Sequence, residues 1–182
     1  HFRSNRTKGS GIKKKKQVFF VGSKDVWNDG YDLVEKALKL IPKNKRPVVK
    51  IVSWSNKNNE RLTDEDLVKE YNKSLVTLCL SRLETFGLVP LESMASGTPV
   101  IATKVSGHRE TINDGKTGFL VDFDPSEISE KILYFTKSPK QSYDMGNKAR
   151  DHIVESWDWT KLIDDLEKNL VSFVGIKQKY SR

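Results

Sequence analysis

Residues 81–102 of this chain read SRLETFGLVPLESMASGTPVIA and include two glutamates, Glu84 and Glu92, eight positions apart. The apolar run LVTLCLS leads into this stretch, and a second apolar run, TPVIAT, overlaps its end. A glycine-containing loop and a helix-like segment, PLESMASG, lie between the two runs. A strand, a loop, a helix and another strand in this order form the unit from which parallel sheets are built. The stretch therefore predicts an α/β fold with both carboxylates just beyond a strand end.

The same alternation continues along the chain from residue 17 onward. Five short apolar runs are strand candidates: QVFFVG, VVKIVSW, LVTLCLS, TPVIAT and TGFLVDF. Six segments with helical periodicity or capping signals are helix candidates: YDLVEKALKLI, TDEDLVKEYNKS, PLESMASG, PSEISEKILYFTKS, SYDMGNKARDHIVES and TKLIDDLEKNLVSFV. The alternation predicts a Rossmann-like, mainly parallel sheet with helices on both faces. We expect one domain over residues 17–182, preceded by a basic tail at residues 1–16.

The composition is typical of a globular domain. The chain has 182 residues, of which 36% are hydrophobic and 31% are charged, a size that suits one domain. Its longest apolar runs fall far short of the ~20 residues that cross a bilayer. The single cysteine, Cys79, lies in an apolar run, which predicts a buried, inert thiol and excludes a disulfide framework. Because the first residue is His1 and no secretory signal is visible, we expect a piece of a longer chain.

The net charge of +8 comes largely from the two ends, RSNRTKGSGIKKKK and KQKYSR. Two interpretations remain open for these lysines and arginines. They form solvated tails, or they hold the protein peripherally against an anionic membrane or an acidic polymer. No helix-turn-helix, zinc-finger or RNP-type aromatic pattern accompanies them, so we expect no nucleic-acid partner.

The start of the central helix predicts an anion site. If Pro90 is the first helical residue, as its fixed φ favours, then Val89 is the N-cap. Neither Val89 nor Leu88 nor Gly87 has a side-chain oxygen that could cap the free backbone N–H groups. An uncapped helix start preceded by a glycine favours an anion, most often a phosphate.

The two glutamates flank this helix start. At the third helical position, the Glu92 carboxylate could accept hydrogen bonds from vicinal hydroxyl groups, as acidic residues do with ribose in dinucleotide folds. Glu84 would lie on the other side of the phosphates, where it could accept hydrogen bonds from a sugar ring. The alternative is structural, because a glutamate near a helix N-terminus favours the helix dipole and Glu84 could be an ordinary loop residue.

A family resemblance supports the first interpretation. The segment ETFGLVPLESMASGTPVIAT closely resembles the E-x7-E region of retaining GT-B glycosyltransferases, the group called family 4 or group 1. The segments SGHRETINDGKTGFLV, FVGS with NDGYDLVEKAL, and ESWDWTKLIDDLE are similar to other segments of the same family, so the likeness covers roughly residues 17–170. His108 lies near the site by this resemblance, either as a ligand contact or as an ordinary loop residue.

The resemblance implies the C-terminal, donor-binding domain of an enzyme. That enzyme would transfer a sugar from a nucleotide-diphosphate sugar to a glycan, lipid-linked or polymer acceptor, without an obligatory metal, at the cytoplasmic face of a membrane. The acceptor would bind a separate N-terminal domain that is absent from this chain. Glu84 is then the catalytic residue that contacts the donor sugar, and Glu92 binds the ribose. The remaining donor-binding positions are Phe86, Gly87, Leu88 and Val89 at the helix start, and Gly22, Ser23 and Lys24 after the first strand.

The first strand is followed by a departure from the family pattern. Ser23 stands where the family has an arginine that contacts the diphosphate, and Asp29 stands where it has a lysine. A carboxylate would repel the phosphates, so we expect Asp29 to point elsewhere and Lys24 to be the nearest substitute cation. The alternative function that follows is a non-catalytic nucleotide-sugar or partner-binding module with a degenerate diphosphate site.

A second departure concerns the length of one connection. Between VVKIVSW and TDEDLVKEY the family has a helix and a further strand, whose following loop holds the nucleobase, whereas this chain has only SNKNNERL. Either this protein lacks the helix and the strand, or a mobile segment between Trp54 and Thr63 is left out of this sequence. We expect the second, because a sheet without an interior strand would leave backbone groups unpaired.

Overall fold

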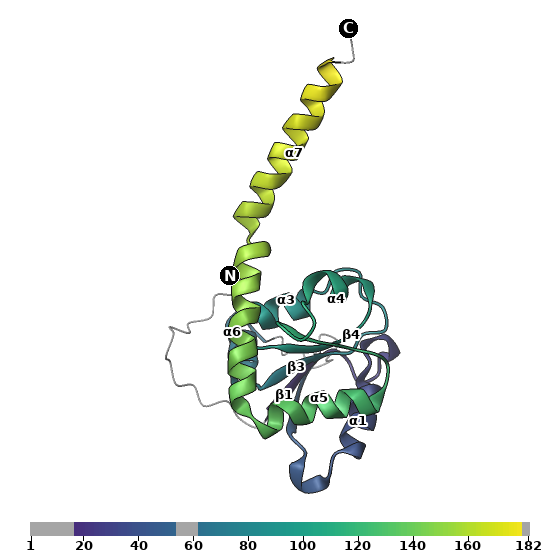
Figure 1. The fold of residues 1–182 in the computed structure, drawn as a ribbon. Coiled ribbons are helices and arrows are strands. Elements are labelled where there is room, and N and C mark those ends of the chain that lie inside the picture. Colours follow the sequence, from purple (N-terminus) through teal and green to yellow (C-terminus); the bar gives the residue numbers. More distant parts are fainter. Residues whose placement is uncertain (1–16, 54–61, 180–182) are drawn as a thin grey trace.

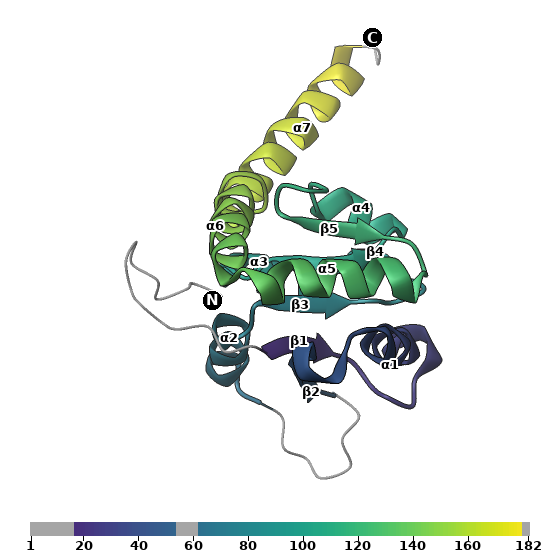
Figure 2. The ribbon, with the colours of Figure 1, turned by 60° about the horizontal axis from the view of Figure 1, so that its bottom comes forward.

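The computed structural model describes residues 17–53 and 62–179, and of residues 175–179 only the backbone. The basic tail predicted at residues 1–16 lies outside these ranges. Five strands form one sheet in the order β2-β1-β3-β4-β5, and every neighbouring pair is parallel (Figures 1 and 2). The strands are β1 (Gln17–Val21), β2 (Val48–Val52), β3 (Val76–Cys79), β4 (Val100–Thr103) and β5 (Gly118–Val121). The predicted α/β class with a parallel sheet is confirmed.

Helices cover both faces of the sheet. They are α1 (Tyr31–Leu40), α2 (Asp64–Lys73), α3 (Leu88–Ala95), α4 (Ser106–Thr111), α5 (Pro125–Lys137), α6 (Pro139–Ser156) and α7 (Trp159–Lys179), with short 3-10 turns at Trp27–Asp29 and Lys43–Lys45. Residues alternate along β1, so that Val18 and Phe20 pack with α1 and α5, whereas Phe19 packs with α2 on the other face. Figure 1 shows α1 and α5 on one side of the sheet and α3 on the other.

The strand order corrects one premise of the sequence analysis. β1 pairs with β2 on one side and with β3 on the other, and β2 is the last strand of the described sheet (Figure 2). The short connection after β2 therefore concerns the edge of the sheet, and the interior strands are all paired. The argument from unpaired interior backbone groups was wrong because strand order does not follow chain order, and the expectation that a segment is left out after Trp54 stays a prediction. Residues 54–61 lie outside the described part of the chain.

The last helix, α7, extends away from the sheet (Figure 1). Its predicted apolar face is present as Ile163, Leu166, Leu170 and Phe173, but each of these side chains is more than half exposed. Among the helices that the structure describes, none combines the length and the apolar composition that crossing a membrane requires.

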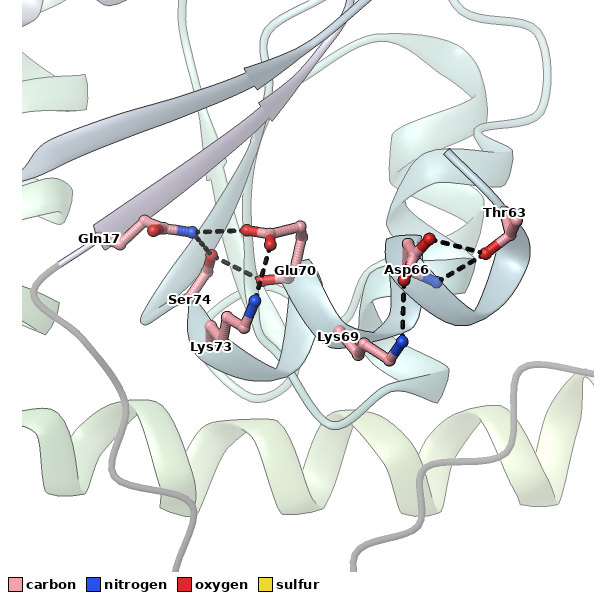
Figure 3. Close-up of polar contacts among 7 residues, drawn as sticks. All are labelled: Gln17, Thr63, Asp66, Lys69, Glu70, Lys73 and Ser74. Carbon is pink, nitrogen blue, oxygen red and sulfur yellow. Dashed lines mark hydrogen bonds and ion pairs between the residues drawn. The ribbon is translucent and has the colours of Figure 1, made fainter. Parts of the chain in front are cut away.

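Helix α2 is anchored to the first strand by a polar cluster (Figure 3). Its predicted N-cap is confirmed, because the Thr63 hydroxyl accepts a hydrogen bond from the Asp66 amide at 3.2 Å. At the other end of α2, the Gln17 side chain donates to Glu70 at 3.2 Å and to the Ser74 hydroxyl at 3.0 Å. These contacts set the position of α2 along the sheet, and with it the residues that α2 directs toward α3.

One glycine brings the loop after β1 against the end of β3. Gly30 has a left-handed backbone with φ of 78°, and it caps the start of α1. A Cβ atom at this position would lie 2.0 Å from the Leu80 carbonyl oxygen. Only glycine therefore allows the two segments to approach this closely.

Two alanine substitutions test this close approach. Gly115 has a similar φ of 71° but nothing within 4 Å of a Cβ, so Gly115→Ala is the matched control. We expect Gly115→Ala to lower the free energy of unfolding by about 1–2 kcal/mol, the cost of a left-handed L-residue. In Gly30→Ala, steric overlap with the Leu80 carbonyl should lower the free energy of unfolding by about 1–3 kcal/mol more than in Gly115→Ala. Chemical denaturation measures both, and equal losses would contradict the steric argument.

Candidate functional site

The candidate site lies at the C-terminal edge of the sheet, where the loops after β1 and β3 meet. Because β1 and β3 are adjacent and parallel, their carboxyl ends lie side by side. The Arg82 amide donates to the Asn28 carbonyl at 2.8 Å, and the Asn28 side chain donates to the Leu83 carbonyl at 3.1 Å. The two loops therefore form one surface.

Arg82 joins the two loops and was missed by the sequence analysis. Its guanidinium group lies 2.8 Å from Asp32 of α1 and 4.3 Å from the centre of the Trp27 ring. Burial would raise the pKa of Asp32, but hydrogen bonds from Lys36 and Arg82 outweigh it and hold that pKa below its usual value. Because Asp32 neutralises it, Arg82 acts as a clamp rather than as a replacement for the missing family arginine.

Helix α3 begins two residues earlier than predicted. Its first residue is Leu88, and its N-cap is Gly87, which has a left-handed backbone with φ of 90°. The left-handed turn starts the helix before Pro90, which becomes the third helical residue and lacks an N–H like any proline. No side chain caps this end. The amides of Leu88 and Val89 are therefore the uncapped donors of the first turn, and Glu92 lies in the second turn.

The loop before α3 is held by α4 and by the junction between α6 and α7. The Gly107 amide donates to the Glu84 carbonyl at 3.0 Å, and a Cβ at Gly107 would lie 2.5 Å from the Phe86 nitrogen. The Phe86 ring packs edge-on against Trp157, with ring centres 5.5 Å apart. The Phe86 amide already donates to the Glu84 carboxylate at 3.3 Å. A ligand would have to compete for that amide.

Glu92 is oriented by a buried tyrosine that the sequence analysis did not single out. The Tyr71 hydroxyl donates to Oε2 of Glu92 at 3.0 Å, and the Tyr71 side chain has no exposed surface. Burial, then the negative charge of Glu92, raises the pKa of Tyr71, so its hydroxyl remains a donor. Burial raises the pKa of Glu92 and the charge of Asp64 adds to this, whereas the Tyr71 hydrogen bond lowers it. Oε1 of Glu92 is left to accept from a ligand.

Both glutamates lie near the end of β3. Cys79, the last residue of that strand, is buried as predicted. Burial raises the pKa of its thiol, and the negative charges of Glu84 and Glu92 raise it further. The two carboxylates therefore act on the same strand end, and the thiol stays protonated and unreactive.

The backbone amides of Gly22 and Ser23, just after β1, already donate hydrogen bonds within the chain. The Gly22 amide donates to the Val52 carbonyl at 2.8 Å, and the Ser23 amide donates to the Asp29 carboxylate at 2.6 Å. Lys24 is exposed and places its Nζ 5.2 Å from the centre of the Tyr31 ring. Asp29 thus turns back onto its own loop. The donor-binding roles of Gly22, Ser23 and Lys24 stay predictions.

His108 lies on the short helix α4, which the sequence did not predict, and its side chain is 1% exposed. Its Nδ1 atom lies 2.9 Å from the Thr103 carbonyl oxygen. Burial lowers the pKa of His108, whereas the Thr103 carbonyl and the charge of Glu84 oppose this. The ring is therefore a buried, neutral group beside the helix start. No group of three His, Cys, Asp or Glu side chains that could hold a metal ion occurs among residues 17–53 and 62–179.

Comparisons with known proteins show which family this chain resembles. Residues 59–152 match the family model described as glycosyl transferases group 1. The chain is 44% identical over 86 residues to a trehalose synthase of Pyrococcus horikoshii, covering 47% of this chain and 20% of that protein. It is 38% identical over 97 residues to a D-inositol 3-phosphate glycosyltransferase of Paenarthrobacter aurescens, covering 53% of this chain and 24% of that protein.

A solved structure agrees with the fold. The Anabaena protein HepE in complex with UDP superposes with a TM-score of 0.71 at 18% sequence identity, covering 89% of this chain and 50% of that chain. HepE has also been solved with UDP-glucose. At this identity the likeness concerns the fold alone, a Rossmann-like sheet of the GT-B type. The matched part of this chain spans a quarter or less of the curated relatives described above.

The raised pKa of Glu92 makes a prediction about stability and pH. The usual pKa of this carboxyl group is 4.5, and in the folded state it is raised. Such a group stabilises the fold fully below its usual pKa, and this stability is lost as the pH rises through the folded-state pKa. We therefore expect Glu92→Gln to raise the thermal midpoint at about pH 7.5, and the gain to vanish below about pH 4.

Glu35→Gln on the exposed face of α1 is the control, and we expect it to change stability by less than about 0.5 kcal/mol at any pH. Thermal unfolding followed by circular dichroism from acid to neutral pH measures both variants. A Glu92→Gln variant that is less stable than the original protein at neutral pH would contradict the role of burial.

Proposed function

Because this chain belongs to the glycosyl transferases of group 1, we propose that it is the domain that binds the nucleotide-sugar donor of a retaining glycosyltransferase. One observation carries this proposal. The start of α3 has no side-chain cap, lies at the C-terminal edge of a parallel sheet and is flanked by Glu84 and Glu92. The UDP and UDP-glucose complexes of HepE support a donor of this class.

The diphosphate binds at the start of α3. The amides of Leu88 and Val89 donate to phosphate oxygens, and the positive end of the helix dipole favours the same anion. Gly87 has no side chain, so a ligand can approach the backbone closely. These groups act without an obligatory metal ion.

The two carboxylates hold the sugars on either side of the diphosphate. Glu92, oriented by Tyr71, accepts hydrogen bonds from ribose hydroxyl groups through Oε1. Glu84 accepts from the transferred sugar. As the bond between sugar and diphosphate breaks, negative charge develops on the leaving diphosphate, and the α3 amides stabilise it because they are already oriented.

The acceptor binds to a part of the protein outside this chain. The curated relatives are four to five times longer than the segments that match, since those segments are 20% and 24% of their length. We propose a separate acceptor domain for a glycan, lipid-linked or polymer acceptor. The net charge of +8 supports peripheral contact with an anionic membrane on the cytoplasmic side.

A second candidate function is a non-catalytic nucleotide-sugar or partner-binding module. The observation in its favour is the Asp29 carboxylate, which takes the Ser23 amide and brings negative charge to the end of β1. In that case the chain would bind a nucleoside diphosphate weakly, and neutralising the carboxylate in Asp29→Asn would strengthen binding. In the catalytic case Asp29 holds the loop in place, so Asp29→Asn would weaken binding.

Calorimetry with UDP, ADP and GDP tests donor binding by this chain. We expect at least one of them to bind, and we expect EDTA to leave its dissociation constant unchanged because backbone amides rather than a metal ion hold the phosphates. Absence of heat with all three at millimolar concentration would contradict the proposal. A large loss of affinity in EDTA would contradict the metal-free site.

Alanine variants separate the roles of the two glutamates. Because hydrogen bonds to a charged group contribute about 1.5–3 kcal/mol, Glu92→Ala should weaken nucleoside diphosphate binding roughly 10–100-fold. Glu84→Ala should leave that affinity nearly unchanged, weaken binding of the matching nucleotide sugar, and abolish transfer in the full-length protein. Glu130→Ala, an exposed position on α5, is the control for both. Equal effects of both substitutions on the nucleoside diphosphate would contradict the separate roles.

A further inference from the structure

His108 is a buried polar side chain with only one of its two ring nitrogens satisfied. The side chain is 1% exposed, and Nδ1 lies 2.9 Å from the Thr103 carbonyl oxygen and 3.4 Å from the Thr103 hydroxyl oxygen. Within residues 17–53 and 62–179, the hydrogen bonds of the ring involve Nδ1 alone, and no group forms one with Nε2. Nε2 is not fully enclosed and keeps a small contact with solvent, so a donor from outside the chain can reach it.

The contact with Thr103 determines the tautomer. A carbonyl oxygen can only accept a hydrogen bond, so Nδ1 must carry the proton and donate it. In the neutral ring, Nε2 then carries a lone pair and acts as an acceptor. The lowered pKa of His108, caused by burial, agrees with a neutral ring.

The unsatisfied edge of the ring faces the start of α3. The Cδ2 atom, which is bonded to Nε2 on the side opposite Nδ1, lies 3.3 Å from the point where a Cβ of Gly87 would stand. The Cγ atom of Glu84 lies 3.7 Å from the same point. His108 and Glu84 therefore border the same glycine at the N-cap of α3 from two different elements.

Two hydrogen-bond acceptors, Nε2 of His108 and the carboxylate of Glu84, indicate which chemical group of a ligand would bind beside Gly87. A diphosphate is ionised at neutral pH, has few protons to donate, and would be repelled by a bare lone pair. The hydroxyl groups of a sugar attached to that diphosphate are donors, and Nε2 accepts from them without a change in protonation.

We infer that Nε2 of His108 accepts a hydrogen bond from a hydroxyl group of the transferred sugar, and that His108 is a specificity-determining residue for the donor. This inference rests on the proposed function and deepens it. A site that accepts from a sugar hydroxyl discriminates against analogues that lack it, because the buried acceptor then loses its partner.

Two substitutions separate a ligand contact from a structural role. The asparagine amide in His108→Asn can take the place of Nδ1–H and donate to Thr103, but it places no acceptor at the position of Nε2. The longer side chain in His108→Gln places an oxygen near the position of Nε2 but cannot make the same contact with Thr103. A structural histidine would be replaced best by asparagine, and a ligand contact would be rescued best by glutamine.

The measurement is a ratio of dissociation constants obtained by calorimetry. UDP is compared with UDP-glucose, ADP with ADP-glucose, and GDP with GDP-mannose, and the pair that the unmodified chain binds best is used for the variants. The ratio of the constant for the nucleoside diphosphate to that for the nucleotide sugar cancels a general loss of stability. We expect His108→Asn to lower this ratio roughly 3–10-fold, the loss of one neutral hydrogen bond, and His108→Gln to retain most of it.

A readout on the unmodified chain does not depend on how the variants fold. We expect the ¹⁵N signal of Nε2 of His108 to shift when the nucleotide sugar is added, and to move much less with the nucleoside diphosphate alone. An unchanged ratio in His108→Asn, or equal ¹⁵N shifts with both ligands, would overturn the inference while the proposed function stands. If the unmodified chain binds none of these ligands, the proposed function fails, and the inference fails with it.

Discussion

The left-handed backbone of Gly87 is the constraint on which the candidate site depends. It turns the chain from the loop after β3 directly into α3, so that the first helical turn begins without a side-chain cap. A larger residue would be strained at a φ of 90° and would meet the edge of His108 within 3.3 Å. The same glycine therefore exposes the amides of the helix start and leaves room for His108 and Glu84 beside them.

The parallel sheet assembles the rest of the site around this glycine. Parallel strands end on the same edge, so the loop after β1 comes to lie beside the loop that carries Glu84. Gly30 allows close approach to Leu80, and Arg82 clamps the two loops through Asp32. Both contacts join segments that are about 50 residues apart in the chain, so they hold the site only once the sheet has formed.

Two titratable side chains at the site, Glu92 and His108, lie in surroundings that disfavour their charged forms. Glu92 is partly buried next to Tyr71, and burial raises its pKa. His108 is held neutral by burial and oriented by the Thr103 carbonyl. Such arrangements reduce the stability of a domain but orient acceptors before a ligand arrives, a trade-off that is typical of binding sites.

Apolar periodicity and capping residues such as Thr63 act over a few neighbouring positions, so they were enough to predict the α/β class, the strands and the longer helices. The sequence also indicated Glu84 and Glu92 beyond a strand end, since local order along the chain decides that. It misplaced the start of α3, because a proline is compatible with more than one early helical position, and it missed the six-residue α4, which has too few turns to show a period. Three features became visible only in the folded chain: β2 lies at the edge of the sheet, Tyr71 reaches Glu92, and the ring of His108 faces Gly87. These contacts join separate elements, so their geometry depends on strand order and helix packing, which no local pattern contains.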